Sequence, residues 1–206
     1  MRNPATDPLA RVKALRIRQK KEWGEILSGW ETRNRYQIES PDGHQWFAGE
    51  VDGGLGAMLL RVFLKSKRPF SMEVRAGDGT LALRLVRPWR WLFSRLEILS
   101  PSGATIGAIQ QRFRFFARHY DVLGPDGSLW ATLEGPFFRP WTFWVRHQGR
   151  DLGQIQKKWS GIGREFFTDS DSFGVEFFAD AVDLALRQLV LGATFLIDFV
   201  HFENRR

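Results

Sequence analysis

The sequence predicts a mainly β protein in which roughly ten to twelve antiparallel strands close into a barrel around one hydrophobic helix. Two observations predict the strands: turn signals recur at regular spacing, and apolar residues alternate with polar ones between them. A third observation predicts the helix, because residues 189–202 near the C-terminus are almost all apolar.

Five turn signals centre on glycines, four of them in Pro-Asp-Gly, Asp-Gly or Pro-Ser-Gly sequences: Gly43, Gly79, Gly103, Gly127 and Gly149. Glycine supplies the positive backbone dihedral angles that tight hairpin turns require. The last four of these glycines stand 24, 24 and 22 residues apart, so each unit has the length of one β-hairpin.

The segments between the turns alternate with a period of two, as half-buried strands do; Leu81, Leu83 and Leu85 are one example. Consecutive hairpins remove their exposed edges most simply by closing into a barrel. A propeller is less suitable, because a four-stranded blade takes about 40 residues and only about three blades would fit. A barrel of this many strands is too wide for its own side chains to fill, so a plug is expected.

The apolar run supplies that plug, in a helix expected over about residues 181–202. The alternative is a membrane span, but the run is shorter than the ~20 residues that a span needs. Asp198 would also stand in the hydrocarbon, at a cost of about 2.5–3.5 kcal/mol or more. Inside a barrel, Asp198 needs hydrogen-bond donors or an ion pair, or else it stays protonated.

Residues 1–34 are predicted to form a basic helical segment ahead of a barrel domain over residues 35–206. Leu9, Val12 and Leu15 have helical spacing, and Asp7 with Pro8 makes a plausible N-cap and first turn. Such a helix would lie on a membrane or partner, or pack against the barrel wall.

The composition limits the function. A net charge of +7 suits an anionic partner, either phospholipid or nucleic acid. The chain has no cysteine, which excludes disulfides, thiolate chemistry and palmitoylation. No nucleophile elbow, phosphate loop or clustered histidines occur, so no covalent catalysis is expected. The N-terminus lacks the apolar core of a secretory signal, which predicts a cytoplasmic protein.

Several stretches closely resemble the phospholipid scramblase family: "WSGIGREFFTDSDSFGVEF" with "LVLGATFLIDFVHFE", and upstream "GWETRNRYQIESPDG", "RPFSMEVRAGDGTLALRLVRP" and "LEILSPSGATIGAIQQRF". The likeness covers roughly residues 19–203. It implies a tubby-like barrel of about twelve strands around the C-terminal helix. It also implies binding of acidic phospholipids and calcium-dependent, ATP-independent movement of phospholipids between leaflets. The sequence differs from animal members in lacking a Pro-rich N-terminal extension and the palmitoylated cysteine cluster, in whose place stands "RPWRWLFSR".

The resemblance places a calcium segment at residues 169–180, with Asp169, Asp171 and Asp180 as candidate ligands. Their spacing is similar to that of an EF-hand loop, which would place calcium as the only expected cofactor. Phe173 stands where another oxygen ligand belongs, and "FGVEF" has the pattern of a strand. The alternative is a turn whose aspartates cap the backbone.

Three segments that mix arginine with Trp or Phe begin about eight or nine residues after a turn glycine, so they should share the opposite end of the barrel. Aromatic rings suit the headgroup zone and arginine matches phosphate. The lipid-contacting residues predicted there are Arg87, Trp89, Arg90, Trp91, Arg95, Arg112, Arg114, Phe115, Arg118, Arg139 and Trp141. The same chemistry could stack single-stranded nucleic acid, which is the less favoured partner, or the aromatics could point inward onto the plug.

We therefore expect a scramblase-like protein, peripheral on the inner face of the plasma membrane, that binds acidic phospholipids and translocates them. The alternative is a tubby-like module that binds lipids or regulates partners without transport. The physics favours binding over translocation, because a plugged barrel offers no obvious hydrophilic path across a bilayer.

Overall fold

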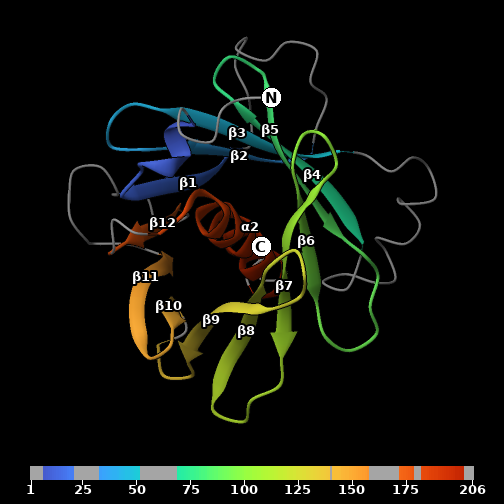
Figure 1. Ribbon diagram of the computed structural model, residues 1–206, viewed down its shortest axis with the longest axis vertical. Coiled ribbons are helices and arrows are strands. Elements are labelled where there is room, and N and C mark those ends of the chain that lie inside the picture. The colour runs from blue at the N-terminus through green and yellow to red at the C-terminus, as the bar shows by residue number, and fades with distance from the viewer. Residues whose placement is uncertain are drawn as a thin grey trace.

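In the part of the chain that the structure describes, twelve antiparallel strands form one closed barrel, and one long helix runs through its centre (Figure 1). The computed structural model describes residues 7–20, 33–51, 69–139, 141–157, 172–178 and 182–201. The strands are β1 (Ala14–Lys20), β2 (Arg33–Glu39), β3 (Gln45–Val51), β4 (Phe70–Ala76), β5 (Leu81–Arg87), β6 (Arg95–Leu99), β7 (Thr105–Arg112), β8 (Ala117–Leu123), β9 (Leu129–Pro136), β10 (Thr142–His147), β11 (Arg150–Lys157) and β12 (Ser172–Phe177). A short 3-10 helix, η2 (Pro8–Ala10), precedes them and the helix α2 (Leu184–His201) follows them.

Each strand pairs with its neighbours in sequence, and β1 closes the ring by pairing with both β2 and β12. The predicted closed barrel with a central C-terminal helix is therefore confirmed. All five turn glycines have φ between 78° and 89°, the conformation that the hairpin signals predicted. Because the strands alternate in direction, these five turns share one end of the barrel, and the remaining connections between strands share the other.

The prediction of a basic N-terminal helix is wrong for residues 14–20, which form β1. Leu15 and Ile17 are fully buried, with a strand period of two, because the barrel needs this strand to close. The barrel domain therefore begins well before residue 35. Asp7 does cap a helix, but only the short η2, where its carboxylate accepts a hydrogen bond from the Leu9 N–H at 2.9 Å. Residues 1–6 and 21–32 of the predicted helix lie outside the described residues.

The helix α2 fills the barrel interior. Every residue from Leu189 to Phe199 is buried, on all sides of the helix. By length and composition α2 could cross a membrane, but 72% of it is enclosed by the barrel. Gly107 on β7 and Gly192 on α2 permit close packing, since a Cβ on Gly192 would lie 2.9 Å from the Ile98 side chain. The helix is therefore the core of the domain because the barrel encloses it, although its 18 residues would be long enough for a span.

Two buried charged groups fix the helix in position. Near its start, the Arg187 guanidinium donates to the carbonyl oxygens of Val12 and Val182 and lies over the Phe177 ring. Near its end, the Asp198 carboxylate accepts a 2.8 Å hydrogen bond from the Tyr36 hydroxyl. The same carboxylate lies 3.9 Å from the Lys157 ammonium, so it has the structural role that the sequence favoured.

We expect Asp198→Leu to lower the free energy of unfolding by about 3–5 kcal/mol, because it leaves the buried Lys157 ammonium without this partner. Urea denaturation measures this loss. Thr194→Val also makes the helix more apolar, but it removes only a hydrogen bond within the helix, so it should cost about 1 kcal/mol. An Asp198→Leu protein that is as stable as the parent, or that becomes integral in membranes, would contradict this role.

Candidate functional site

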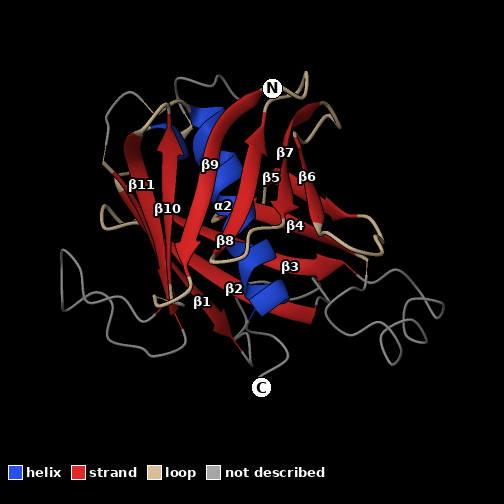
Figure 2. Cartoon of the chain, turned by 90° about the horizontal axis from the view of Figure 1, so that it is seen from below, coloured by secondary structure: helices blue, strands red, loops and turns tan. Residues whose placement is uncertain are grey.

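The end of the barrel opposite the glycine turns carries a cluster of exposed apolar side chains, here called the aromatic rim. Three loops form it: residues 88–94 between β5 and β6, residues 113–116 between β7 and β8, and residues 137–141 between β9 and β10. In Figure 2 the loops that follow β7 and β9 lie at the end of the barrel where α2 also ends. The exposed rim side chains are Trp89, Trp91, Leu92, Phe93, Phe113, Phe115, Phe116, Phe137 and Phe138.

The structure thus brings the three predicted segments together at one end of the barrel. Of the aromatic residues predicted there, Trp89, Trp91 and Phe115 are exposed, whereas Trp141 is half-buried and packs against the core. Most exposed phenylalanines of the rim were not predicted individually. The signal was present in the adjacent pairs Phe115–Phe116 and Phe137–Phe138, since two neighbours on a strand cannot both face inward.

The seven predicted arginines divide into two groups of different function. The side chains of Arg90, Arg114 and Arg139 are exposed, one on each rim loop. Within the described part of the chain, no hydrogen bond or ion pair engages these three guanidinium groups. They are therefore available to an external anion.

The other four predicted arginines are engaged by the protein. Arg95 lies 3.2 Å from Glu97, and Arg112 lies 2.6 Å from Asp121, both on the barrel wall. Arg87 is 3% exposed and donates to the Ser94 hydroxyl at 2.8 Å. Arg118 donates to the carbonyl oxygens of Pro136 and Arg139. The prediction of direct lipid contact therefore suits these four side chains less well than the three on the loops.

Arg118 holds the loop 137–141. Its guanidinium donates to the carbonyl oxygens of Arg139 at 3.1 Å and Pro136 at 3.5 Å, and it lies 4.5 Å from the centroid of the Phe143 ring. Burial lowers the pKa of Arg118, with Tyr120 acting in the opposite direction. This arginine shapes the base of the loop.

Ser94 connects the first two loops in the same way. Its N–H donates to the Gln111 side chain at 3.1 Å, and its carbonyl oxygen accepts from the Gln111 N–H at 2.8 Å. The loop 88–94 is thereby fixed to the end of β7. The rim loops therefore have anchored bases beneath exposed tips.

The last turn of α2 contacts the bases of the rim from inside. The Tyr120 hydroxyl lies 2.7 Å from His201 Nε2, and the Phe70 ring stacks on Phe199 with centroids 4.2 Å apart. Arg87 lies over that Phe70 ring, so a cation stands near the negative end of the helix dipole, where it is favourable. The plug thus supports the rim.

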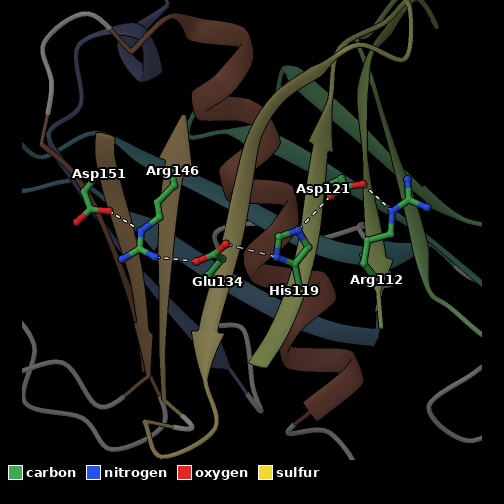
Figure 3. A network of polar contacts seen from close by, with 6 residues as sticks. All are labelled: Arg112, His119, Asp121, Glu134, Arg146 and Asp151. Atoms are coloured by element: carbon green, nitrogen blue, oxygen red, sulfur yellow. Dashed lines mark hydrogen bonds and ion pairs between the residues drawn. The ribbon is translucent and has the colours of Figure 1, made fainter. Parts of the chain in front are cut away.

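The outer wall beside the rim has its charges paired in a belt across five strands, β7 to β11 (Figure 3). The belt runs Arg112, Asp121, His119, Glu134, Arg146 and Asp151. A hydrogen bond with Asp151, aided by Glu134, raises the pKa of Arg146. His119 is buried between two carboxylates and belongs to this belt; no group of residues able to hold a metal occurs in the described part of the chain. The belt leaves this wall with little unpaired charge.

The predicted calcium ligands Asp169, Asp171 and Asp180 all lie outside the described residues. The residues between them form β12, which pairs with β1 on one side and β11 on the other. Residues 172–177 are thus a strand, as the pattern of "FGVEF" indicated. The assignment of calcium to the three aspartates stays a prediction.

Comparison with known proteins shows which family the sequence matches. The scramblase family model matches residues 1–204. Human phospholipid scramblase 1 is 29% identical over 216 residues, covering 98% of this chain and 66% of that protein. Mouse phospholipid scramblase 1 is 28% identical over 215 residues, covering 98% of this chain and 64% of that protein. The chain thus spans slightly less than two thirds of the length of these relatives.

Among solved structures, the fold is similar to an X-ray structure of a protein from Arabidopsis thaliana, with a TM-score of 0.53 and 10% sequence identity. That likeness covers 93% of this chain and 96% of the other, and it concerns the fold alone. It agrees with the tubby-like barrel that the sequence predicted.

We expect Arg118→Ala to loosen the loop 137–141 while leaving the barrel folded. Loss of the two charge-assisted hydrogen bonds should cost about 1.5–3 kcal/mol and speed amide exchange at Thr142, whose N–H donates to the Arg139 carbonyl at 3.2 Å. Hydrogen exchange by mass spectrometry or NMR measures this. The matched control is Arg112→Ala, which breaks an exposed pair and should cost less than about 1 kcal/mol. Equal protection at Thr142 in both variants would contradict the positioning role.

Proposed function

Since this chain belongs to the scramblase family, we propose that it binds acidic phospholipid membranes through the aromatic rim. One observation carries the proposal: three loops at one end of the barrel each present exposed aromatic side chains beside one arginine whose guanidinium has no partner among the described residues. Aromatic rings partition into the interfacial zone of a bilayer, and guanidinium groups bind lipid phosphates. The net charge of +7 favours an anionic membrane.

The protein acts from the membrane surface in this proposal, on the cytoplasmic face. The one described helix with the length and composition of a span is the plug, so it does not provide an anchor while the barrel is closed. Nucleic acid is the less favoured partner, because the rim offers mostly phenylalanine and leucine, which gain more from lipid than from bases stacked in water.

We propose transbilayer movement of phospholipids as a second activity, which rests on the names of the relatives and not on a path within the barrel. Because α2 fills the interior, lipid headgroups would cross where the rim disturbs the bilayer. Calcium dependence and independence of ATP come to this proposal from the family resemblance. The alternative is a module that binds membranes without transport.

The binding proposal predicts that replacing Arg90, Arg114 and Arg139 together by alanine weakens association with phosphatidylserine vesicles on the order of 100-fold, at about 1 kcal/mol for each charge. Vesicle co-sedimentation at fixed ionic strength measures it. The matched control replaces Arg11, Arg84 and Arg150, which are also exposed but lie on the turn end or the wall. Equal loss in both triple variants would show that net charge alone drives binding; unchanged binding in the first would overturn the rim.

The transport proposal predicts movement of a fluorescent phospholipid across the vesicle bilayer, without ATP, above the rate in protein-free vesicles. Replacing Phe115 and Phe116 by serine should remove this movement together with binding. If the protein binds vesicles but phospholipid flux does not exceed that of protein-free vesicles, the transport proposal is wrong and the module that binds membranes without transport is the better description.

Calcium dependence can be tested in the same vesicles. The three candidate ligands, Asp169, Asp171 and Asp180, come to this proposal from the family resemblance. We expect replacing all three by asparagine to remove calcium stimulation, because an amide binds calcium more weakly than a carboxylate does. Calcium stimulation that the triple variant retains in full would contradict this assignment.

A further inference from the structure

The three rim loops differ in the chemistry of their exposed side chains. Among the described residues, the exposed apolar side chains of the loops 113–116 and 137–141 are all phenylalanines, from 64% at Phe113 to 88% at Phe116. The loop 88–94 exposes Trp89 at 49% and Trp91 at 71%, beside Leu92 and the less exposed Phe93. The apolar side chains on one side of the rim are therefore all phenylalanine, whereas the other side combines two tryptophans with Leu92 and Phe93.

Tryptophan and phenylalanine prefer different depths in a bilayer. The indole N–H of tryptophan retains a hydrogen bond when the ring lies at the headgroup level, and tryptophan is enriched there. Phenylalanine has no polar atom and gains by moving below that level. The phenylalanine loops should therefore prefer a greater depth than the tryptophan loop.

The loops cannot insert to different depths independently of one another, because their bases are fixed to the barrel. Arg118 ties the loop 137–141 to β8, and Ser94 ties the loop 88–94 to the end of β7. A difference in depth between loops must therefore appear as a tilt of the whole barrel.

The free arginines limit the depth of insertion. Each loop carries one of them, and a guanidinium group keeps its charge at the phosphate level while its aliphatic stem lies along apolar surface. Arg114 stands between Phe113 and Phe115, so it can remain at the phosphates while its neighbours insert. The same three like charges disfavour a rim-to-rim pair of two copies of this chain, which selects an anionic bilayer as the partner.

We propose that the barrel docks on an anionic phospholipid bilayer in a tilted orientation, with the phenylalanine loops 113–116 and 137–141 below the phosphates and the tryptophan loop 88–94 at their level. This orientation rests on the proposed function and adds to it the side of the rim that enters the hydrocarbon. Any disturbance of lipid packing is then concentrated beside β7 to β10.

The absence of cysteine from the chain permits a direct test. We would introduce one cysteine at a time into the full chain, as Phe116→Cys, Phe138→Cys and Leu92→Cys, with Ser102→Cys on an exposed glycine turn at the opposite end as the control. All four sites are exposed, so the fold is retained. A nitroxide on each cysteine reports depth in phosphatidylcholine–phosphatidylserine vesicles from its collisions with oxygen and with an aqueous nickel chelate.

We expect labels at 116 and 138 to gain oxygen collisions and lose nickel collisions on vesicle binding. The label at 92 should show a smaller change, and the label at 102 should show none. Equal depths at 92 and 116, or a deeper label at 92, would overturn the tilt while leaving the proposed function intact.

Two other outcomes separate the proposals further. If none of the four labelled proteins sediments with the vesicles, the proposed function itself fails. If the rim labels become shielded without lipid as protein concentration rises, and the chain dimerises, a second copy occupies the rim and the bilayer orientation is wrong.

Discussion

A closed sheet of twelve strands surrounds a space that its own side chains cannot fill, and the rest of this structure depends on how α2 fills it. The helix is apolar all round because strands enclose it all round. Two buried charges, Arg187 near its start and Asp198 near its end, find partners on the surrounding chain. Such groups are costly to bury alone, so they fix both the axial position and the rotation of the helix.

Because α2 runs through the barrel and ends at one side, the two ends of the barrel differ in structure. Five tight glycine turns form one end. At the other end, the last turn of α2 supports the bases of the rim loops through Tyr120 and Phe70. Because the core is complete without the loop tips, their aromatic side chains are left outside it. A large exposed apolar cluster on a soluble fold indicates a surface that meets a partner.

The distribution of charge also favours the rim as the surface that meets a partner. On the wall, arginines are matched by carboxylates on neighbouring strands, as in the belt of Figure 3. On the rim, Arg90, Arg114 and Arg139 have no such partners among the described residues. Positive charge beside apolar rings is the pattern expected of a protein that meets an anionic interface. The spanning-length helix of this scramblase-family chain is enclosed by the barrel, so the proposed membrane binding relies on the rim.

By itself, the sequence determined the barrel, its turns and the helix within it. Period-two alternation, turn glycines and an apolar run that contains Asp198 are local consequences of backbone geometry and burial. The same local patterns misassigned residues 14–20, whose strand exists because the sheet must close between β12 and β2. These patterns also assigned all seven arginines to the rim, without distinguishing those that pair within the protein from those that do not. Only the tertiary structure decided that Arg87 and Arg118 turn inward to hold loop bases, while Arg90, Arg114 and Arg139 find no partner among the described residues, because pairing depends on neighbours from distant strands.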